Sequence, residues 1–345
     1  MTKIFNQLQI CLILLGSISS FAASSQTEPT CEHANGYSVC HFKGVLVEVV
    51  QNASENRLSI DDLDLLAIRE NAFKNLSTTR LSFSQGNRIS VLKPESFRGL
   101  KKLQRLDLDD NVVPLSANLF SELDNLQSLS LIFNKINAVP KDTFSGLTNL
   151  MWLYLGHNDV TSIDKDSFSG LSSSLYILWL NNNNISNIQP GSFAMLTDLN
   201  RLHLEQNLLE NIFPGTFNGL HKLEVLFLEH NQLTIISKTD FRGLSKLKTL
   251  NLQHNKIQTL ESGAFSDLTK LEVLDLRKNQ LNVIKSEVFD GLASLRVLDL
   301  SDNLISAFDQ NSFSGLSVIT NIYLINNNVS EIDRGHVGLL DTATV

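Results

Sequence analysis

The sequence is poor in the residues that several classes of protein require. It holds 3 cysteines among 345 residues, only 7% aromatic side chains, and fewer basic than acidic residues, 28 against 36. A formal charge of −8 argues against a protein that binds nucleic acid through bulk positive charge, so we expect no nucleic-acid partner. The 42% of hydrophobic residues lies far above the charge-rich composition of disordered chains. A folded core of considerable size is therefore expected.

Long hydrophobic runs are also missing. The apolar run of residues 10–18 follows Lys3 and precedes a small-x-small signal at residues 20–22, which is the pattern of a cleaved secretory signal peptide rather than of a membrane span. No later stretch approaches the run of about 18 apolar residues that a transmembrane helix needs. We therefore expect residues 1–22 to be removed and the mature protein to be secreted and extracellular, with no membrane span.

Few cysteines remain after this processing. Cys11 leaves with the signal peptide, and Cys31 and Cys40 stay. An even number of cysteines in a secreted chain favours a disulfide over free thiols, and two ligands cannot complete a structural zinc site. Four Asn-x-Ser/Thr triplets fit the same compartment, with plain loop asparagines as the alternative interpretation. These candidate glycosylation sites are Asn52, Asn75, Asn184 and Asn328.

What the sequence has in abundance is a repeated pattern. Windows that begin with Leu199 recur at intervals of 24 residues as far as Ile319, and four less regular windows precede them from Leu103 onward. Two degenerate windows, which contain Leu58 and Leu81, come before these. The total of twelve windows predicts a repeat protein, because a fixed period of this length is the signature of a solenoid.

Each window combines two periodicities. Leu226 and Leu228 alternate with variable residues, which predicts a short strand with one buried face. The second half carries Phe-x-x-Leu, as in Phe241 and Leu244, and this helix-like spacing puts both side chains on one inward face. No repeat can bury such a core alone, so neighbouring coils must stack. The expected product has a parallel strand ladder on one side and short helical or irregular turns on the other.

Two further positions of the window are nearly constant. An asparagine ends the first half, and its amide donors and acceptor can satisfy backbone groups of its own coil and of the adjacent coil. A phenylalanine follows in the second half, with Val337 in the last repeat. Both sets predict a structural core rather than catalysis. They comprise Asn111, Asn134, Asn158, Asn183, Asn207, Asn231, Asn255, Asn279, Asn303 and Asn327, and Phe120, Phe144, Phe168, Phe193, Phe217, Phe241, Phe265, Phe289 and Phe313.

The consensus LxxLxLxxNxLxxLxxxxFxxLxx resembles the typical 24-residue extracellular leucine-rich repeat of Toll-type receptor ectodomains and of secreted innate-immune proteins. The resemblance implies an α/β repeat solenoid, a horseshoe with a parallel concave β-sheet and short helical or irregular convex segments. Cys31 and Cys40, followed by the apolar residues 45–50, resemble a reduced N-terminal cap whose disulfide covers the open end of the core. The expected organisation is a signal peptide, a cap with one disulfide, about twelve repeats and a tail, over residues 1–22, 23–54, 55–342 and 343–345.

The C-terminal cap that the resemblance implies, with cysteines of its own, has no counterpart in this sequence. An uncapped last repeat exposes an apolar end of the core. We therefore expect either that this end is covered by the tail or by a partner chain, or that the sequence is a truncated product. A partner chain would give an oligomer through the C-terminal repeat.

The variable residues between the strand leucines point outward on the concave face, which the resemblance implies is the ligand-binding face. Both tryptophans of the chain occupy such positions. Exposed aromatic side chains rimmed by polar groups are typical of a binding hot spot, whereas rings that only stack across strands would support the sheet. The candidate ligand-binding residues are Phe133, Trp152, Tyr154, Ile177, Trp179, His203 and Phe227.

Motifs for catalysis are missing. The sequence has no Gly-x-Ser-x-Gly elbow, no His-Glu-x-x-His pair and no phosphate-binding Gly-Lys-Ser/Thr. We expect no enzyme, no catalytic residue and no cofactor. His157, His230 and His254 share one place after the strand, but the spacing fixes no third ligand, so no metal site is predicted.

Two functions agree with these expectations. The first is a secreted protein that binds an extracellular protein or microbial ligand through its concave face, in innate-immune recognition or as a soluble receptor-like decoy. The second is an extracellular matrix or cell-adhesion structural protein, in which the solenoid serves as a spacer. The two differ in whether one compact patch or the entire surface captures the partner.

Overall fold

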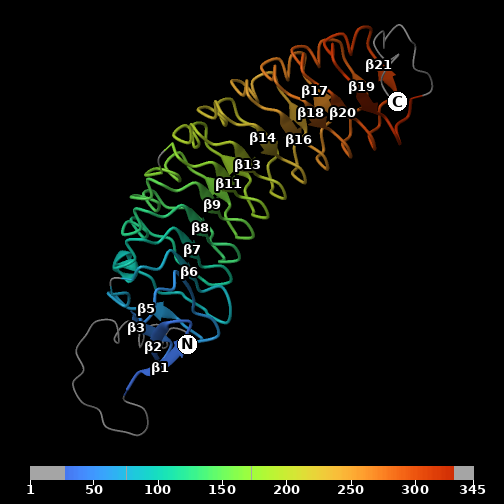
Figure 1. The fold of residues 1–345 in the computed structure, drawn as a ribbon. Coiled ribbons are helices and arrows are strands. Elements are labelled where there is room, and N and C mark those ends of the chain that lie inside the picture. Colours follow the sequence, from blue (N-terminus) through green and yellow to red (C-terminus); the bar gives the residue numbers. More distant parts are fainter. Residues whose placement is uncertain (1–27, 75, 172, 330–345) are drawn as a thin grey trace.

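The computed structural model describes residues 28–74, 76–171 and 173–329, which form an arc of stacked coils (Figure 1). Twelve short strands run parallel in one sheet along the inner side of the arc. The predicted signal peptide at residues 1–22, Asn75, Val337 and the tail at residues 343–345 lie outside the described residues. The strands of this sheet are β4 (Arg57–Ser59), β6 (Arg80–Ser82), β7 (Arg105–Asp107), β8 (Ser128–Ser130), β9 (Trp152–Tyr154), β11 (Ile177–Trp179), β13 (Arg201–His203), β14 (Val225–Phe227), β16 (Thr249–Asn251), β18 (Val273–Asp275), β20 (Val297–Asp299) and β22 (Asn321–Tyr323).

The strands of the long sheet are aligned by their central leucines. Leu202 of β13 pairs with Leu226 of β14, which pairs in turn with Leu250 of β16. All three side chains are fully buried, because alternation along a strand turns every second residue toward the core. Each predicted window supplies one strand of this sheet. The structure thereby confirms the solenoid fold and the predicted number of repeats.

The return halves of the coils were expected to be short helical or irregular turns, and nearly all of them are turns. The part of the chain that the structure describes contains one helix, the 3-10 helix η1 (Pro94–Phe97), and no helix there is long and apolar enough to cross a membrane. Elsewhere the Phe-x-x-Leu segment is a single turn, as where the Leu244 amide donates to the Phe241 carbonyl at 3.2 Å. Both side chains are buried as predicted. One turn is enough to bring them inward, and the chain then continues directly toward the next strand.

Neighbouring coils also contact each other in these return halves. At Gly219, whose φ is +92°, an added Cβ would lie 2.5 Å from the carbonyl oxygen of Ala194 in the preceding coil. Only glycine allows both this backbone conformation and this approach. Three small parallel sheets, which the sequence did not predict, add backbone hydrogen bonds between coils. They pair β10 (Ser162–Ile163) with β12 (Asn187–Ile188), β15 (Ile235–Ile236) with β17 (Thr259–Leu260), and β19 (Val283–Ile284) with β21 (Ala307–Phe308).

The predicted asparagines form a buried ladder that joins each coil to the one before it. Asn231 Nδ2 donates to the carbonyl oxygens of Leu204 and Leu228 at 2.9 and 3.0 Å. Its Oδ1 accepts a hydrogen bond from the Leu209 amide at 3.0 Å. Asn87 joins the ladder as a further member, in addition to the ten asparagines predicted from the sequence. These side chains satisfy backbone groups that neither strand nor turn pairs.

The predicted phenylalanines form a spine in the core of the return halves. The ring centroids of Phe217 and Phe241 are 6.3 Å apart, those of Phe241 and Phe265 are 6.1 Å apart, and the rings of each pair are nearly parallel. Phe289 and Phe313 continue the stack toward the C-terminal end. The expectation of an apolar spine is confirmed over the described repeats.

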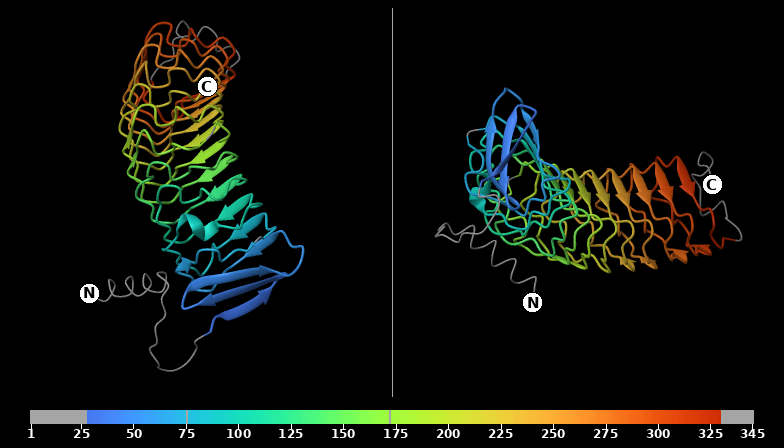
Figure 2. Two further views of the ribbon diagram at one scale, coloured as in Figure 1. Left: turned by 90° about the vertical axis from the view of Figure 1, so that its left-hand side faces the viewer. Right: turned by 90° about the horizontal axis from the view of Figure 1, so that it is seen from below.

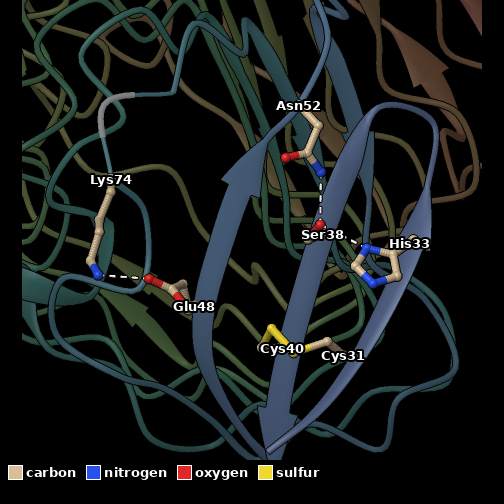
Figure 3. The surroundings of a disulfide bond; sticks show 7 residues. All are labelled: Cys31, His33, Ser38, Cys40, Glu48, Asn52 and Lys74. Carbon is tan, nitrogen blue, oxygen red and sulfur yellow. Dashed lines mark hydrogen bonds and ion pairs between the residues drawn. A yellow bond between two sulfur atoms is a disulfide. The ribbon is translucent and has the colours of Figure 1, made fainter.

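A second sheet covers the N-terminal end of the solenoid (Figure 2). A disulfide joins Cys31 to Cys40 within its first hairpin, as Figure 3 shows. Tyr37 of this sheet is fully buried, and its hydroxyl donates to the Glu55 carbonyl oxygen at 2.6 Å. The sheet therefore closes the apolar end of the core. Its strands are β1 (Thr30–Ala34), β2 (Tyr37–Phe42) and β3 (Val45–Gln51), which are antiparallel, and β5 (Ala67–Ile68), which pairs parallel with β3.

Candidate functional site

Outward side chains form two rows near the middle of the concave face. Because the strands pair in register, equivalent positions of consecutive repeats lie side by side. Trp152 of β9 lies beside Ile177 of β11 in the first row. The second row runs across β9, β11, β13 and β14 and consists of Tyr154, Trp179, His203 and Phe227. Six of the seven candidate residues thus share one surface.

The second row is a continuous series of ring contacts, called here the aromatic ladder (Tyr154, Trp179, His203 and Phe227). The rings of Tyr154 and Trp179 meet edge to face with their centroids 5.5 Å apart. His203 lies between Trp179 and Phe227, and its ring centroid is 4.6 Å from each of theirs. All four side chains are partly exposed. The ladder therefore supports the sheet through cross-strand contacts and also presents ring surface to solvent.

Phe133, the seventh candidate, lies apart from the ladder. It follows β8 in a left-handed backbone conformation, with φ of +56°, and it is 51% exposed. Its ring is tilted against that of His157, with the centroids 4.4 Å apart. The outward residues Ser128 and Ser130 of β8 are buried, unlike the exposed positions expected there, since they are small side chains beside the large rings of β9.

Polar atoms without partners lie beside the aromatic ladder, at the next outward position of the repeats. Asn181 Oδ1, Glu205 Oε2 and Glu229 Oε2 are buried and have no hydrogen-bond partner among the described residues. The indole Nε1 of Trp179 is likewise unpaired there. Buried polar atoms are almost always paired, so four unpaired atoms in three adjacent repeats distinguish this part of the face. Asn181 was not among the candidates predicted from the sequence. Its position two residues after Trp179, on the same face of the strand, could have indicated it.

Two carboxyl groups of the concave face have raised pKa values. Burial raises the pKa of Glu229 to about 7, and the negative charges of Glu205 and Asp275 contribute in the same direction. Burial also raises the pKa of Asp109 to about 6, although the Ser130 hydroxyl donates to this carboxylate at 2.6 Å and lowers the pKa. Both carboxyl groups therefore titrate close to neutral pH in the folded protein.

Replacing Glu229 by glutamine should remove part of the pH dependence of stability. The folded pKa of about 7 exceeds the ordinary value of 4.5, so the folded state holds the proton more tightly and the free energy of unfolding falls as the pH rises between these values. At pH 8 we expect Glu229→Gln to be more stable than the wild type by about 1 to 2 kcal/mol, after a discount for partial exposure. At pH 4 the two proteins should be equally stable.

Urea unfolding of both proteins at the two pH values measures this difference. The conservative change keeps the size of the side chain, so a gain that is equal at pH 4 and pH 8 would contradict the role of the charge. No gain at pH 8 would show that the carboxylate is solvated in the folded state.

The repeated histidines lie at the edge of the face where the strands end. His230 and His254 stack with their ring centroids 4.1 Å apart, and burial, followed by the neighbouring His230, lowers the pKa of His254. In residues 28–74, 76–171 and 173–329, no group of three or more His, Cys, Asp or Glu side chains is placed to hold a metal ion. The pair itself would supply two ligands, fewer than structural or catalytic zinc sites use.

Three of the four candidate glycosylation sites lie within the described residues, and all three are exposed. Asn184 and Asn328 follow strands in the repeats. Asn52 lies in the loop after β3, and its Nδ2 donates to the Ser38 hydroxyl at 2.7 Å (Figure 3). Their exposure would give a glycosyltransferase access, and their occupancy remains a prediction.

The chain matches a known family over nearly all of its described length. The sequence model described as leucine-rich repeat matches residues 56–113, 85–136, 124–174, 173–233, 226–281 and 269–329. Among curated proteins, opticin of Homo sapiens is 38% identical over 63 residues, which are 18% of this chain and 19% of opticin.

Several solved structures have a similar fold. A complex of TLR13 with ssRNA13 matches with a TM-score of 0.67 and 28% identity, over 80% of this chain and 44% of that chain. A leucine-rich repeat protein of Leptospira interrogans matches with a TM-score of 0.63 and 28% identity, over 77% and 65% of the two chains. The mouse RP105/MD-1 complex matches with a TM-score of 0.69 and 21% identity, over 84% and 50%, which shows the fold alone. The chain spans less than two thirds of each of these proteins.

Proposed function

Because this chain belongs to the leucine-rich repeat family, we propose that it is a secreted protein that binds a protein or microbial ligand through its concave face, at the aromatic ladder and the neighbouring Trp152. Members of this family generally serve as binding scaffolds rather than as enzymes. The observation that carries the proposal is the coincidence of stacked, partly exposed rings with unpaired polar atoms in the same three repeats. Aromatic anchors beside unsatisfied polar groups are typical of a binding hot spot.

The chemistry of the face favours a ligand with basic side chains. Asn181 Oδ1, Glu205 Oε2 and Glu229 Oε2 are hydrogen-bond acceptors that receive no donor from the described part of the chain. A lysine or arginine of the ligand would supply donors, and its positive charge would also be attracted to the face of the neighbouring rings. The charge of −8 on the chain supports the same choice of partner.

Secretion and a role in recognition complete the proposal. The signal-peptide pattern of residues 1–22 and the disulfide between Cys31 and Cys40 both agree with an oxidising, extracellular compartment. Two of the similar structures are complexes, one of TLR13 with ssRNA13 and one of RP105 with MD-1. By analogy, we propose innate-immune recognition or a soluble receptor-like decoy as the role of this protein.

Alanine substitution of Trp152 or Trp179 should weaken ligand binding without unfolding the protein. The inward positions of the same strands are filled by leucines, so either ring can be removed without opening the core. We expect each variant to lose about 2 kcal/mol of binding free energy, roughly a thirtyfold loss of affinity, while the melting temperature changes by only a few degrees. The ligand is first captured from extracellular fluid on the mature protein, and its affinity for each variant is then measured.

Tyr323→Ala is the matched control, because Tyr323 occupies the same outward row in β22, four repeats beyond Phe227. Its removal should leave the affinity unchanged. Equal losses from Tyr323→Ala and Trp179→Ala would favour the whole-surface contacts of a matrix or adhesion protein. A large fall in melting temperature for Trp179→Ala would show that the ladder serves only to support the sheet.

A further inference from the structure

A shallow hollow of about 500 Å³ lies on the flank of the solenoid, beside the start of strands β14 to β20. Its charged lining residues come from consecutive repeats and stand just before the strands. Four are basic and two are acidic, which differs from the acidic balance of the whole chain. These six residues are Glu224, Lys246, Lys248, Lys270, Glu272 and Arg296.

The row next to the strands is balanced in charge. The backbone amide of Lys248 donates to the Glu224 carbonyl at 2.8 Å, and the Glu272 amide donates to the Lys248 carbonyl at 2.8 Å. Arg296 follows Glu272 in the same way at 2.9 Å, so negative and positive side chains alternate along the row. Lys248 Nζ lies 3.0 Å from Glu224 Oε2. This row therefore contributes no excess of positive charge.

A second row, two residues earlier, contains Lys246 and Lys270 in adjacent repeats. Several other members of this row are satisfied within the protein: Asn125 and Asn149 each donate to a backbone carbonyl of the preceding repeat, at 2.9 and 2.8 Å. Lys222, in the repeat before Lys246, is paired with an aspartate at 2.8 Å. Lys246 and Lys270 are exposed and have no ion pair with any described residue. They account for the excess of two positive charges in the hollow.

Two unpaired ammonium groups in neighbouring repeats repel each other, since adjacent parallel strands lie only about 4.8 Å apart. A tetrahedral sulfate group between them would accept hydrogen bonds from both and reduce the repulsion. The equivalent asparagines show that the fold does not need lysine at this place. The two positive charges are therefore free to contact a ligand.

We propose that this flank hollow binds sulfate groups of a sulfated polysaccharide. The lining residues of the hollow come from successive repeats, and an extended polymer can present successive sulfates to them. A folded protein partner would need an apolar contact core, whereas Ala293 and Val318 are the apolar side chains of the lining. The site is separate from the aromatic ladder and does not depend on the function proposed for it.

The test compares the mature protein with the double variant Lys246→Asn/Lys270→Asn. Asparagine restores the residue type that bonds to the preceding repeat elsewhere in the row, so the variant should keep its melting temperature. The control Lys141→Asn/Lys165→Asn makes the same change in net charge at exposed lysines of the return halves. Binding of each protein to immobilised, fully sulfated heparin fragments is measured at 50 and 150 mM salt, with desulfated fragments as the blank.

We expect the wild type to bind the sulfated fragments and not the desulfated ones. The Lys246/Lys270 variant should bind at least tenfold more weakly at 150 mM salt, and the slope of log affinity against log salt concentration should fall by about one to two. The control variant should stay within twofold of the wild type. Millimolar inorganic phosphate should not compete, because a single anion lacks the successive contacts of the polymer.

Three results would overturn the proposal. The first is an equal loss of affinity for the sulfated fragments in the two double variants, which would mean that the overall charge of the protein attracts them. The second is full competition by inorganic phosphate, which would mean a site for a small free anion. The third is the absence of wild-type binding at 50 mM salt, which would mean that the lysines are merely solvated.

Discussion

Phe241→Ala should lower the free energy of unfolding by about 3 to 5 kcal/mol, the range for removal of a buried phenylalanine ring. Phe241 is 1% exposed and stacks between Phe217 and Phe265, so the substitution leaves a cavity between three coils. Each coil of a solenoid contacts only its two neighbours, and no distant segment can move in to fill the gap. Urea unfolding followed by circular dichroism measures the loss.

Two controls accompany this prediction. Phe213→Ala removes the same ring from a residue that is 46% exposed, and it should change stability by less than about 0.5 kcal/mol. Phe313→Ala should cost less than Phe241→Ala, because Phe313 lies near the C-terminal end and is 6% exposed. Equal losses at residues 241 and 313 would contradict a cooperative central spine.

Asn231→Ala is expected to cost a similar amount, about 3 to 5 kcal/mol, although it removes only a small polar group. The substitution leaves the amide of Leu209 and the carbonyl oxygens of Leu204 and Leu228 without this partner in the buried interior. Each buried group that loses its hydrogen bond costs about 1 to 3 kcal/mol. The loss in the free energy of unfolding is therefore large for so small a side chain, because three buried backbone groups lose their partner at once.

The comparison for this variant is Asn218→Ala, at an exposed asparagine of the return half that precedes Gly219. It should leave the urea midpoint nearly unchanged. Asn231→Asp provides a second comparison, because it keeps an acceptor for Leu209 but loses both amide donors, and it should be destabilised as well. If Asn231→Ala were as stable as Asn218→Ala, the asparagine ladder would not hold the coils together.

At the concave face, the sequence predicted which side chains point outward but not which neighbours they contact. The alternation of residues along a strand placed Trp152 and Trp179 on the outward face, and the structure agrees. The stacking of Trp179 against His203 depends on two strands whose residues are 24 positions apart. The sequence of a single repeat therefore predicts neither the ring orientations nor the burial of Ser130 beside Tyr154 of the next repeat.

By itself, the sequence determined the twelve coils, the inward leucines, the asparagine ladder and the phenylalanine spine, because a fixed period assigns each residue a place in its coil whatever the neighbouring coils contain. Only the tertiary structure decided that Phe-x-x-Leu forms a turn, that side-chain oxygens of Asn181 and Glu229 are buried without a partner among the described residues, and that Lys246 and Lys270 have no ion pair there. Burial, proton affinity and charge pairing arise from several stacked coils together. A single window of the sequence therefore cannot specify them.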